Sequence, residues 1–174
     1  MDSVPEAPPI VVVMGVAGSG KSTVGALMAQ RLALPFLEGD GLHPPANRAK
    51  MASGQPLDDQ DRRPWLLALA AWIREATASG RGGVMTCSAL KHAYRDEFRR
   101  AGANVWFLHL ALDAATAERR VAGRSGHFMP ARLEKSQYAA LEPLRPDEPG
   151  LTVDAAATPE SIVDEVAKIL PKTW

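Results

Sequence analysis

One short segment constrains the fold of this chain more than any other: the octapeptide GVAGSGKS at residues 15–22. It matches the pattern G-x-x-x-x-G-K-[ST], whose glycines let the backbone turn tightly and aim its N–H groups at phosphate oxygens. The apolar run IVVVM precedes it at 10–14, and the sequence after it has helical character to about residue 33. Because strand, loop and helix follow in the order that the motif requires, we expect a phosphate-binding loop here.

The residue types in this loop assign expected roles. Lys21 is predicted to reach the β- and γ-phosphates of ATP as a catalytic residue, and the hydroxyl of Ser22 to bind Mg²⁺. The positive end of the following helix adds to the attraction for phosphate. The alternative, a glycine-rich turn with an incidental lysine, does not account for the flanking strand and helix. The residues predicted to hold the nucleotide are Gly15, Val16, Ala17, Gly18, Ser19, Gly20, Lys21, Ser22 and Thr23.

Composition excludes several classes of function. The 174 residues carry a formal net charge of zero, so no overall field attracts nucleic acid or membrane. The single cysteine, Cys87, precludes an intrachain disulfide and suits a reducing compartment. Residues 1–9, which contain three prolines and two acids, are predicted to form a flexible arm and not a signal peptide. No apolar run is long enough to span a bilayer. We therefore expect one cytoplasmic domain over residues 1–174.

Apolar strands alternate with helical segments along the chain. Besides 10–14, strands are predicted at 36–37, 84–87, 105–112 and 151–153. Helices are predicted at about 21–33, 48–53, 62–79, 88–101 after an initial loop, 113–122, 132–141 and 159–170. Continuous β-branched strands between helices are typical of a parallel sheet buried on both faces. The predicted class is α/β, with a five-stranded parallel sheet and helices on both faces.

Three features narrow the type of phosphate-binding protein. The chain has neither a D-x-x-G motif after the third strand nor an N-K-x-D motif, which argues against a GTPase switch. A basic loop at 123–134 can fold over the phosphates as a lid. Arg120 and Arg124, next to this loop, are predicted catalytic residues that neutralise charge on the transferring group. Alternatively, these arginines only complement the dipole at a helix end.

Four further segments carry a resemblance to a known family. They are GDGLHP at 39–44, KMASGQPLDDQDRRPW at 50–65, CSALK at 87–91 and RSGHF at 124–128. With them, the chain resembles the gluconokinase family from Val11 to Leu170. The resemblance implies ATP- and Mg²⁺-dependent phosphorylation of D-gluconate on its 6-hydroxyl. It also implies a three-layer P-loop kinase fold, a substrate-binding segment at 40–64, a lid at 123–134 and a homodimer.

Candidate acceptor-binding residues follow the second strand. Asp40 is expected to orient the acceptor hydroxyl and to act in catalysis, because ligands of open α/β sheets lie at the carboxyl ends of strands. The alternative is an aspartate that only shapes a turn. His43 is expected to hydrogen-bond gluconate, or alternatively to cap the helix after Pro44. Arg62 is a further substrate-binding candidate that alternatively pairs with Asp58 or Asp59.

Cationic candidates follow the third strand. Gluconate is an anion, so Ser88, Lys91 and Arg95 are expected to bind it. Lys91 and Arg95 are four residues apart, a spacing that places them on one side of a helix. The alternative is a solvated basic face. The third strand ends in VMTC without an acidic residue, so Ser22 is the only direct protein ligand to Mg²⁺ that the sequence predicts.

Two other functions stay open on the sequence. The acceptor can be another small hydroxylated molecule, such as another sugar acid or shikimate. Shikimate kinases carry D-[ST]-D after the second strand and a glycine triplet after the third, where this chain has Gly39-Asp40-Gly41 and Cys87-Ser88-Ala89. That difference argues against shikimate. The remaining alternative is a nucleotide-binding regulator without transfer chemistry.

Overall fold

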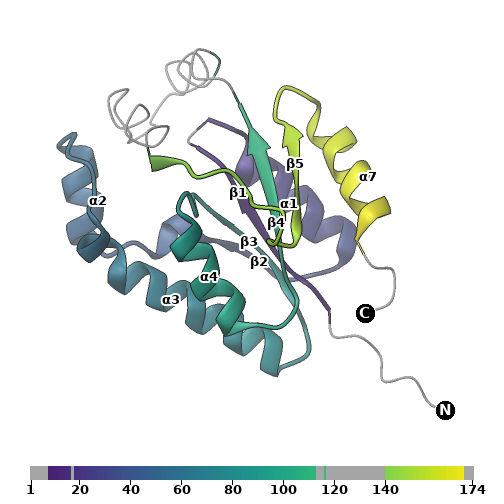
Figure 1. The fold of residues 1–174 in the computed structure, drawn as a ribbon, viewed down its shortest axis with the longest axis horizontal. Coiled ribbons are helices and arrows are strands. Elements are labelled where there is room, and N and C mark those ends of the chain that lie inside the picture. The colour runs from purple at the N-terminus through teal and green to yellow at the C-terminus, as the bar shows by residue number, and fades with distance from the viewer. Residues whose placement is uncertain (1–7, 17, 113–115, 117–139, 171–174) are drawn as a thin grey trace.

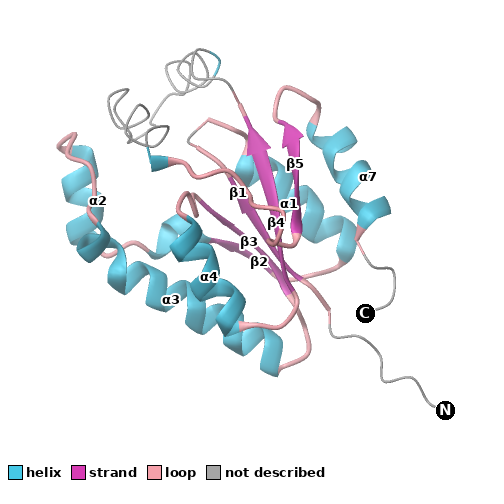
Figure 2. Ribbon diagram, viewed as in Figure 1, coloured by secondary structure: helices cyan, strands magenta, loops and turns pink. Residues whose placement is uncertain are grey.

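A five-stranded sheet forms the middle layer of the molecule (Figures 1 and 2). The computed structural model describes residues 8–16, 18–112, 116 and 140–170. The strands are β1 (Ile10–Met14), β2 (Phe36–Glu38), β3 (Gly83–Cys87), β4 (Val105–Ala111) and β5 (Gly150–Asp154). Their order is β2-β3-β1-β4-β5, and every pairing is parallel. The predicted five-stranded parallel sheet is confirmed.

The register of the sheet brings several loops to one edge. Met14, the last residue of β1, lies opposite Cys87 of β3 and His109 of β4. Glu38, the last residue of β2, lies opposite Thr86. Since parallel strands end on the same side, the loops after β1, β2 and β3 emerge next to one another.

Helices cover both faces of this sheet. They are α1 (Lys21–Leu32), α2 (Pro45–Ala52), α3 (Asp59–Ala78), α4 (His92–Ala101) and α7 (Pro159–Ile169), with a 3₁₀ turn η1 (Gly39–Leu42). On one face Val12 and Met14 pack with Trp65 of α3 and Phe98 of α4. This face therefore carries α3 and α4, as Figure 1 shows.

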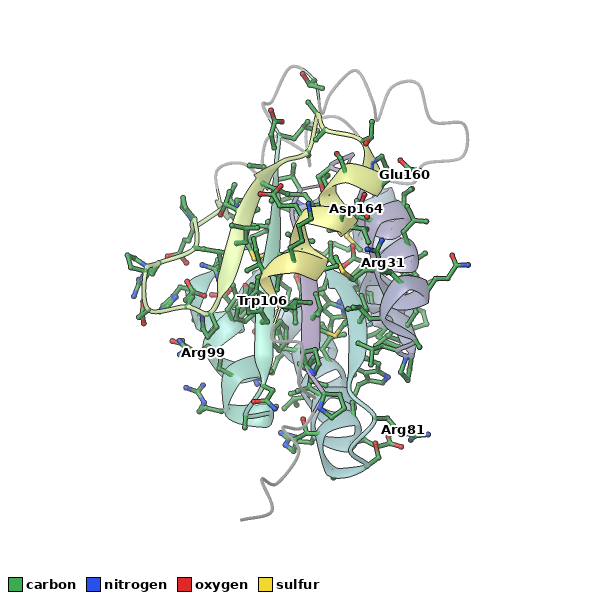
Figure 3. All side chains as sticks on the ribbon, turned by 90° about the vertical axis from the view of Figure 1, so that its right-hand side faces the viewer. Arg31, Arg81, Arg99, Trp106, Glu160 and Asp164 are labelled. Atoms are coloured by element: carbon green, nitrogen blue, oxygen red, sulfur yellow. The ribbon has the colours of Figure 1, made fainter. Side chains whose placement is uncertain are left out.

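The opposite face is covered by α1 and α7. Val11 and Val13 of β1 pack there, because successive side chains of a strand point to opposite faces. Figure 3 looks onto α7 and shows Arg31 of α1 close to Asp164 of α7. Their charged groups are 2.7 Å apart, but both side chains are more than half exposed, so the pair adds little stability. Apolar burial holds the two helices on the sheet.

Two helix starts, those of α2 and α3, differ from the sequence prediction. Helix α2 begins at Pro45 instead of Arg48. Helix α3 begins at Asp59 instead of Arg62, because Asp58 and Asp61 form a capping box in which each side chain accepts from the other's backbone N–H. Pro64 consequently lies inside the helix instead of in its first turn. Helix α4 follows the predicted initial loop and begins at His92, with Lys91 as its N-cap in extended conformation.

Several predictions fall on residues that the structure does not describe. They concern residues 1–7 of the arm, Ala17, Arg120, Arg124, the lid at 123–134 and most of the two helices predicted on either side of it. The subdivision into arm, substrate-binding segment and lid stays a prediction. Among the described residues, none of the helices combines the length and apolar character needed to cross a lipid bilayer.

Candidate active site at the carboxyl edge of the sheet

The glycine-rich loop joins β1 to α1. Gly20 is the N-cap of α1 and has φ +92°, a left-handed conformation that glycine adopts without strain. The ammonium group of Lys21 curls over the loop and donates to the carbonyl oxygens of Gly15, at 3.0 Å, and Val16, at 3.2 Å. The Ser19 hydroxyl is buried and has no hydrogen-bond partner in the described part of the chain. The Lys21 ammonium group and the Ser19 hydroxyl are thus two donors at this loop, and phosphate binding requires such donors.

A cavity of about 340 Å³ opens beside this loop. One wall is the loop itself and the start of α1. The other wall comes from the residues after β5 and from α7, including Ala155, Pro159 and Ile162. Small apolar groups beside a phosphate-binding loop suit the flat ring of a nucleotide base.

A carboxylate that was not among the predicted site residues lies next to Ser22. The hydroxyls of Ser22 and Thr86 both donate to Oε2 of Glu38, at 3.1 and 2.8 Å. A carboxylate and a hydroxyl are the hard oxygen ligands that Mg²⁺ prefers. The described residues hold no group of three or more His, Cys, Asp and Glu side chains arranged for a metal, so any ion here also needs phosphate or water oxygens. The feature of the sequence that could have indicated this carboxylate is the position of Glu38 as the last residue of β2.

Asp40 lies in the η1 turn, pressed against the end of β3. A Cβ atom at Gly39 would lie 2.2 Å from the carbonyl oxygen of Thr86, so only glycine permits this approach. Trp65 Nε1 donates to the Gly39 carbonyl at 2.9 Å and fixes the turn. The Oδ1 atom of Asp40 is buried without a partner among the described residues. A buried carboxylate oxygen without a donor points to a ligand that supplies one.

Cys87 lies nearby at the end of β3 and is fully buried. Burial, and then the negative charge of Asp40, raise the pKa of the Cys87 thiol well above its ordinary value. A thiol of this kind stays protonated and is a poor nucleophile. It contributes to packing under the site.

His43 follows η1 and stacks on Trp65, with ring centroids 4.4 Å apart and planes 12° from parallel. Burial lowers the pKa of His43. Arg62 and Arg48 act in the same direction, while Asp40 opposes them. The imidazole is therefore neutral near pH 7.

Lys91 and Arg62 come together over the ring of Tyr94. Their charged groups lie 5.6 and 5.9 Å from the ring centroid. Asp59, at the start of α3, accepts from Lys91 at 2.8 Å and from the Tyr94 hydroxyl, and lies 4.0 Å from Arg62. The hydrogen bond to Lys91 lowers the pKa of Asp59, and the reverse bond raises the pKa of Lys91. The two cations form a candidate anion site with Asp59 as their resident partner.

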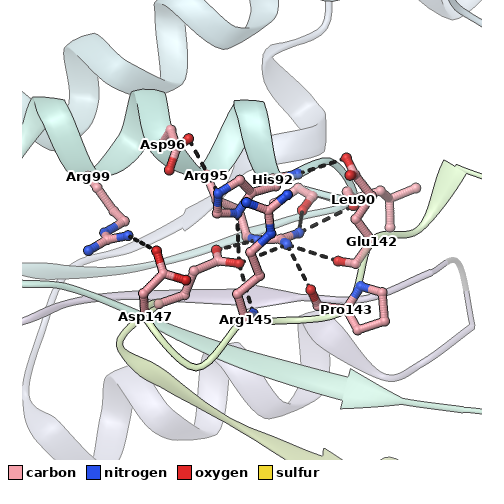
Figure 4. Close-up of polar contacts among 11 residues, drawn as sticks. Leu90, His92, Arg95, Asp96, Arg99, Glu142, Pro143, Arg145 and Asp147 are labelled. Carbon is pink, nitrogen blue, oxygen red and sulfur yellow. Dashed lines mark hydrogen bonds and ion pairs between the residues drawn. The ribbon is translucent and has the colours of Figure 1, made fainter.

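Arg95 does not belong to this anion site, and the expectation that it binds the acceptor is corrected. Its side chain has no exposed area, and Nε and Nη2 donate to the two carboxylate oxygens of Glu148 at 2.6 and 3.1 Å (Figure 4). Its other donors reach main-chain oxygens of Ala89, Leu90, Glu142 and Pro143. Lys91 and Arg95 therefore point apart and do not share one basic face.

The same contacts give Arg95 a structural role beside the site. Residues 89 and 90 lie in the loop between Ser88 and Lys91, so Arg95 holds this loop by its carbonyl groups. Ser88 itself is partly exposed directly after β3. The predicted residues that the structure brings to one edge are those of the glycine loop, Asp40, His43, Arg62, Ser88 and Lys91. Arg120, Arg124 and Ala17 lie outside the described residues.

The parallel sheet and the glycine loop between β1 and α1, with an acceptor-facing edge beside it, define a small P-loop kinase. Comparison with known proteins agrees: residues 10–144 match a family model described as an AAA domain. The chain is 45% identical over 161 residues to a gluconokinase of Gluconobacter oxydans, an alignment that covers 92% of this chain and 90% of the relative.

Two solved structures are similar over nearly their whole length. A sugar kinase of Janibacter sp. HTCC2649 has a TM-score of 0.88 and 45% identity, covering 92% of this chain and 93% of that one. A gluconokinase of Sinorhizobium meliloti 1021 has a TM-score of 0.81 and 42% identity, covering 94% of each chain. The chain belongs to the gluconokinase family.

Proposed function

We propose that this chain transfers the γ-phosphoryl group of ATP to the 6-hydroxyl of D-gluconate, giving 6-phospho-D-gluconate and ADP. The observation that carries the proposal is the 45% identity to a named gluconokinase over 92% of the chain. The chemistry of the edge agrees with it: a polyol acid needs both a cationic site for its carboxylate and polar groups for its hydroxyls. Lys91 and Arg62 supply the first, Asp40 and His43 the second.

The donor half is the glycine loop. Backbone N–H groups of the loop, the N-terminus of α1 and Lys21 bind the phosphates, and the cavity beside the loop takes the adenine ring. The buried, unpartnered hydroxyl of Ser19 supports a ligand at this place. Lys21 then stabilises the charge that develops on the phosphoryl oxygens.

The residues fit a magnesium ion. Ser22 and Glu38, already in hydrogen-bond contact, would hold it. The ion would supply positive charge that offsets the negative charge of the phosphate groups. Glu38 is an addition to the ligand set that the sequence predicted.

In this proposal the acceptor half of the site is formed by the residues that follow β2 and β3, next to the glycine loop. Lys91, Arg62 and Ser88 bind the gluconate carboxylate. Asp40 accepts a hydrogen bond from the 6-hydroxyl, orients its oxygen for in-line attack, and takes its proton late in the transfer. Orientation supplies most of the rate, since phosphoryl transfer needs little covalent help from the protein.

The remaining expectations from the sequence are part of the proposal. Arg120 and Arg124 neutralise charge on the transferring phosphoryl group, and the lid at 123–134 excludes water so that ATP is not hydrolysed. The homodimer and the cytoplasmic location belong here as well, as does the absence of nucleic-acid and membrane partners.

The test is a coupled assay of ADP release over a panel of acceptors. We expect turnover with D-gluconate, and little with other sugar acids, shikimate or nucleoside monophosphates. ADP release at the same rate without any acceptor would refute the proposal. Calorimetry with gluconate separates the kinase from a regulator, because a regulator binds ATP and shows no heat with gluconate.

A further inference from the structure

A buried asparagine links three parts of the acceptor side. Asn47, in α2, donates from Nδ2 to the main-chain oxygen of Asp61 at 2.8 Å. The same nitrogen lies 3.2 Å from Nδ1 of His43. A carbonyl oxygen only accepts hydrogen bonds, so the amide must turn its nitrogen, not its oxygen, toward Asp61. The orientation of the amide is thereby fixed.

This orientation determines where the His43 ring carries its proton. An amide nitrogen offers hydrogens and no lone pair, so Nδ1 of His43 has to accept. A neutral imidazole that accepts at Nδ1 has its hydrogen on Nε2. Protonation at Nδ1 would set two donors against each other, which the contact with Asn47 opposes.

The ring is also held in place. His43 stacks on Trp65, and Trp65 is fixed by its hydrogen bond to the carbonyl of Gly39, next to Asp40. Nε2 makes no hydrogen bond within the described residues, so this N–H is available to a ligand. The charged groups around the ring are Asp40 of η1, Arg48 of α2 and Arg62 of α3.

We propose that Asn47 is a positioning residue that locks His43 as the neutral Nε2–H tautomer, so that His43 serves the acceptor only as a hydrogen-bond donor. The proposal rests on the proposed function for the identity of that acceptor. A hydroxyl group can donate its hydrogen and can also accept at its lone pairs. In this proposal Asp40 and His43 each bind one of these two parts of the acceptor hydroxyl. Asp40 takes the hydrogen, while His43 donates to a lone pair and does not compete for the proton.

The direct test is the nitrogen-15 spectrum of the histidine side chains in the full-length protein. At about pH 7.5 we expect His43 to show an unprotonated Nδ1 and a protonated Nε2, and to hold this form as the pH falls below about 6.5. The signals are assigned by their loss in His43→Gln. An Nδ1–H tautomer in the unsubstituted protein would overturn the proposal.

The variant that reverses the lock is Asn47→Asp. A carboxylate at this place accepts, so the tautomer should switch to Nδ1–H and the pKa of His43 should rise. The KM for gluconate should increase about tenfold while the KM for ATP stays within about twofold. A circular dichroism spectrum checks that the variant is folded. Retention of the Nε2–H tautomer in Asn47→Asp would contradict the proposal, whatever the activity.

The two proposals fail in different ways. Absence of gluconate-dependent turnover in the unsubstituted enzyme would refute the proposed function, and the spectrum would still report the tautomer. An Nδ1–H tautomer of His43 in an enzyme that phosphorylates gluconate would refute only the proposed role of Asn47.

Discussion

Arg95 of α4 and Glu148, in the segment that leads to β5, form a buried ion pair with two hydrogen bonds, and neither side chain is exposed. Glu148 also accepts from the ring of His92 at 2.9 Å and from the backbone N–H of Arg145 at 3.1 Å. Figure 4 shows this network between α4 and the chain that approaches β5. It connects the loop carrying Ser88 and Lys91 to a distant part of the sequence.

Removing one partner of this pair should destabilise the protein strongly. Replacing Glu148 by Gln leaves the guanidinium buried without its counter-ion, which costs about 3–5 kcal/mol. Urea unfolding measures the change. The double variant Arg95→Met with Glu148→Gln should lose less than the sum of the single changes, because it leaves no uncompensated charge. If Glu148→Gln lowers the free energy of unfolding by less than about 1 kcal/mol, the ion pair does not stabilise the segment that leads to β5.

The same carboxylate predicts an acid-sensitive stability. Burial alone would raise the pKa of Glu148, but hydrogen bonds from Arg95, Arg145 and His92 outweigh it and lower the pKa to about 2. A carboxyl group with a lowered folded-state pKa contributes stability that is fully present above its unfolded value, about 4.5. That contribution is lost as the pH falls from about 4.5 toward 2. Unfolding curves at several pH values should show this loss, and Glu148→Gln should flatten it.

Glu38 should matter for magnesium. Glu38→Gln removes the charge beside Ser22, so we expect a rise of about 10- to 100-fold in the Mg²⁺ concentration needed for half-maximal activity. Thr86→Val is the matched control, since it deletes a hydrogen bond to Glu38 and keeps the carboxylate. The control should have a much smaller effect. Equal magnesium requirements in Glu38→Gln and the unsubstituted enzyme would contradict this role.

Lys91 and Asp59 should act in opposite directions on gluconate binding. Lys91→Met removes a cation and should raise the KM for gluconate at least about tenfold. Asp59→Asn removes the carboxylate that is paired with Lys91, so it should lower the KM for gluconate by about threefold. Initial rates at low and high salt provide the check, since the effect of Asp59→Asn should shrink as salt screens the charges. A rise in KM in both variants would mean that Asp59 positions Lys91 and does not compete with the acceptor.

Patterns within short stretches of the sequence predicted the main strands and helices of this molecule. The apolar strand β1, the helix α1 after the glycine-rich loop and the helix α7 each depend on residues close in sequence, and the structure has them as expected. Asp40 and Lys91 were predicted as acceptor-binding residues because polar residues at strand ends converge in a parallel sheet. The structure places both after neighbouring strands, and their role stays a prediction.

The features that sequence reasoning missed depend on distant pairing. Arg95 looked like an exposed cation because its partner, Glu148, is 53 residues away. Glu38 was not among the predicted magnesium ligands because an acidic residue was expected at the end of β3, which ends in VMTC. The register of β2 against β3 places Glu38 opposite Thr86. The end of β2 therefore lies next to the end of β3. Neither pairing has a signature within a short stretch of sequence.

The close contact between Gly39 and the Thr86 carbonyl holds this part of the chain against the end of β3. Glu38 and Asp40 flank this glycine, one beside the phosphate loop and the other on the acceptor side. In the proposed reaction, the distance between the bound ATP and the bound acceptor therefore depends on the backbone of the three consecutive residues 38–40. It depends less on flexible side chains. Any larger residue at position 39 would push both carboxylates off the sheet together, so that one substitution would mis-set metal binding and acceptor alignment at once.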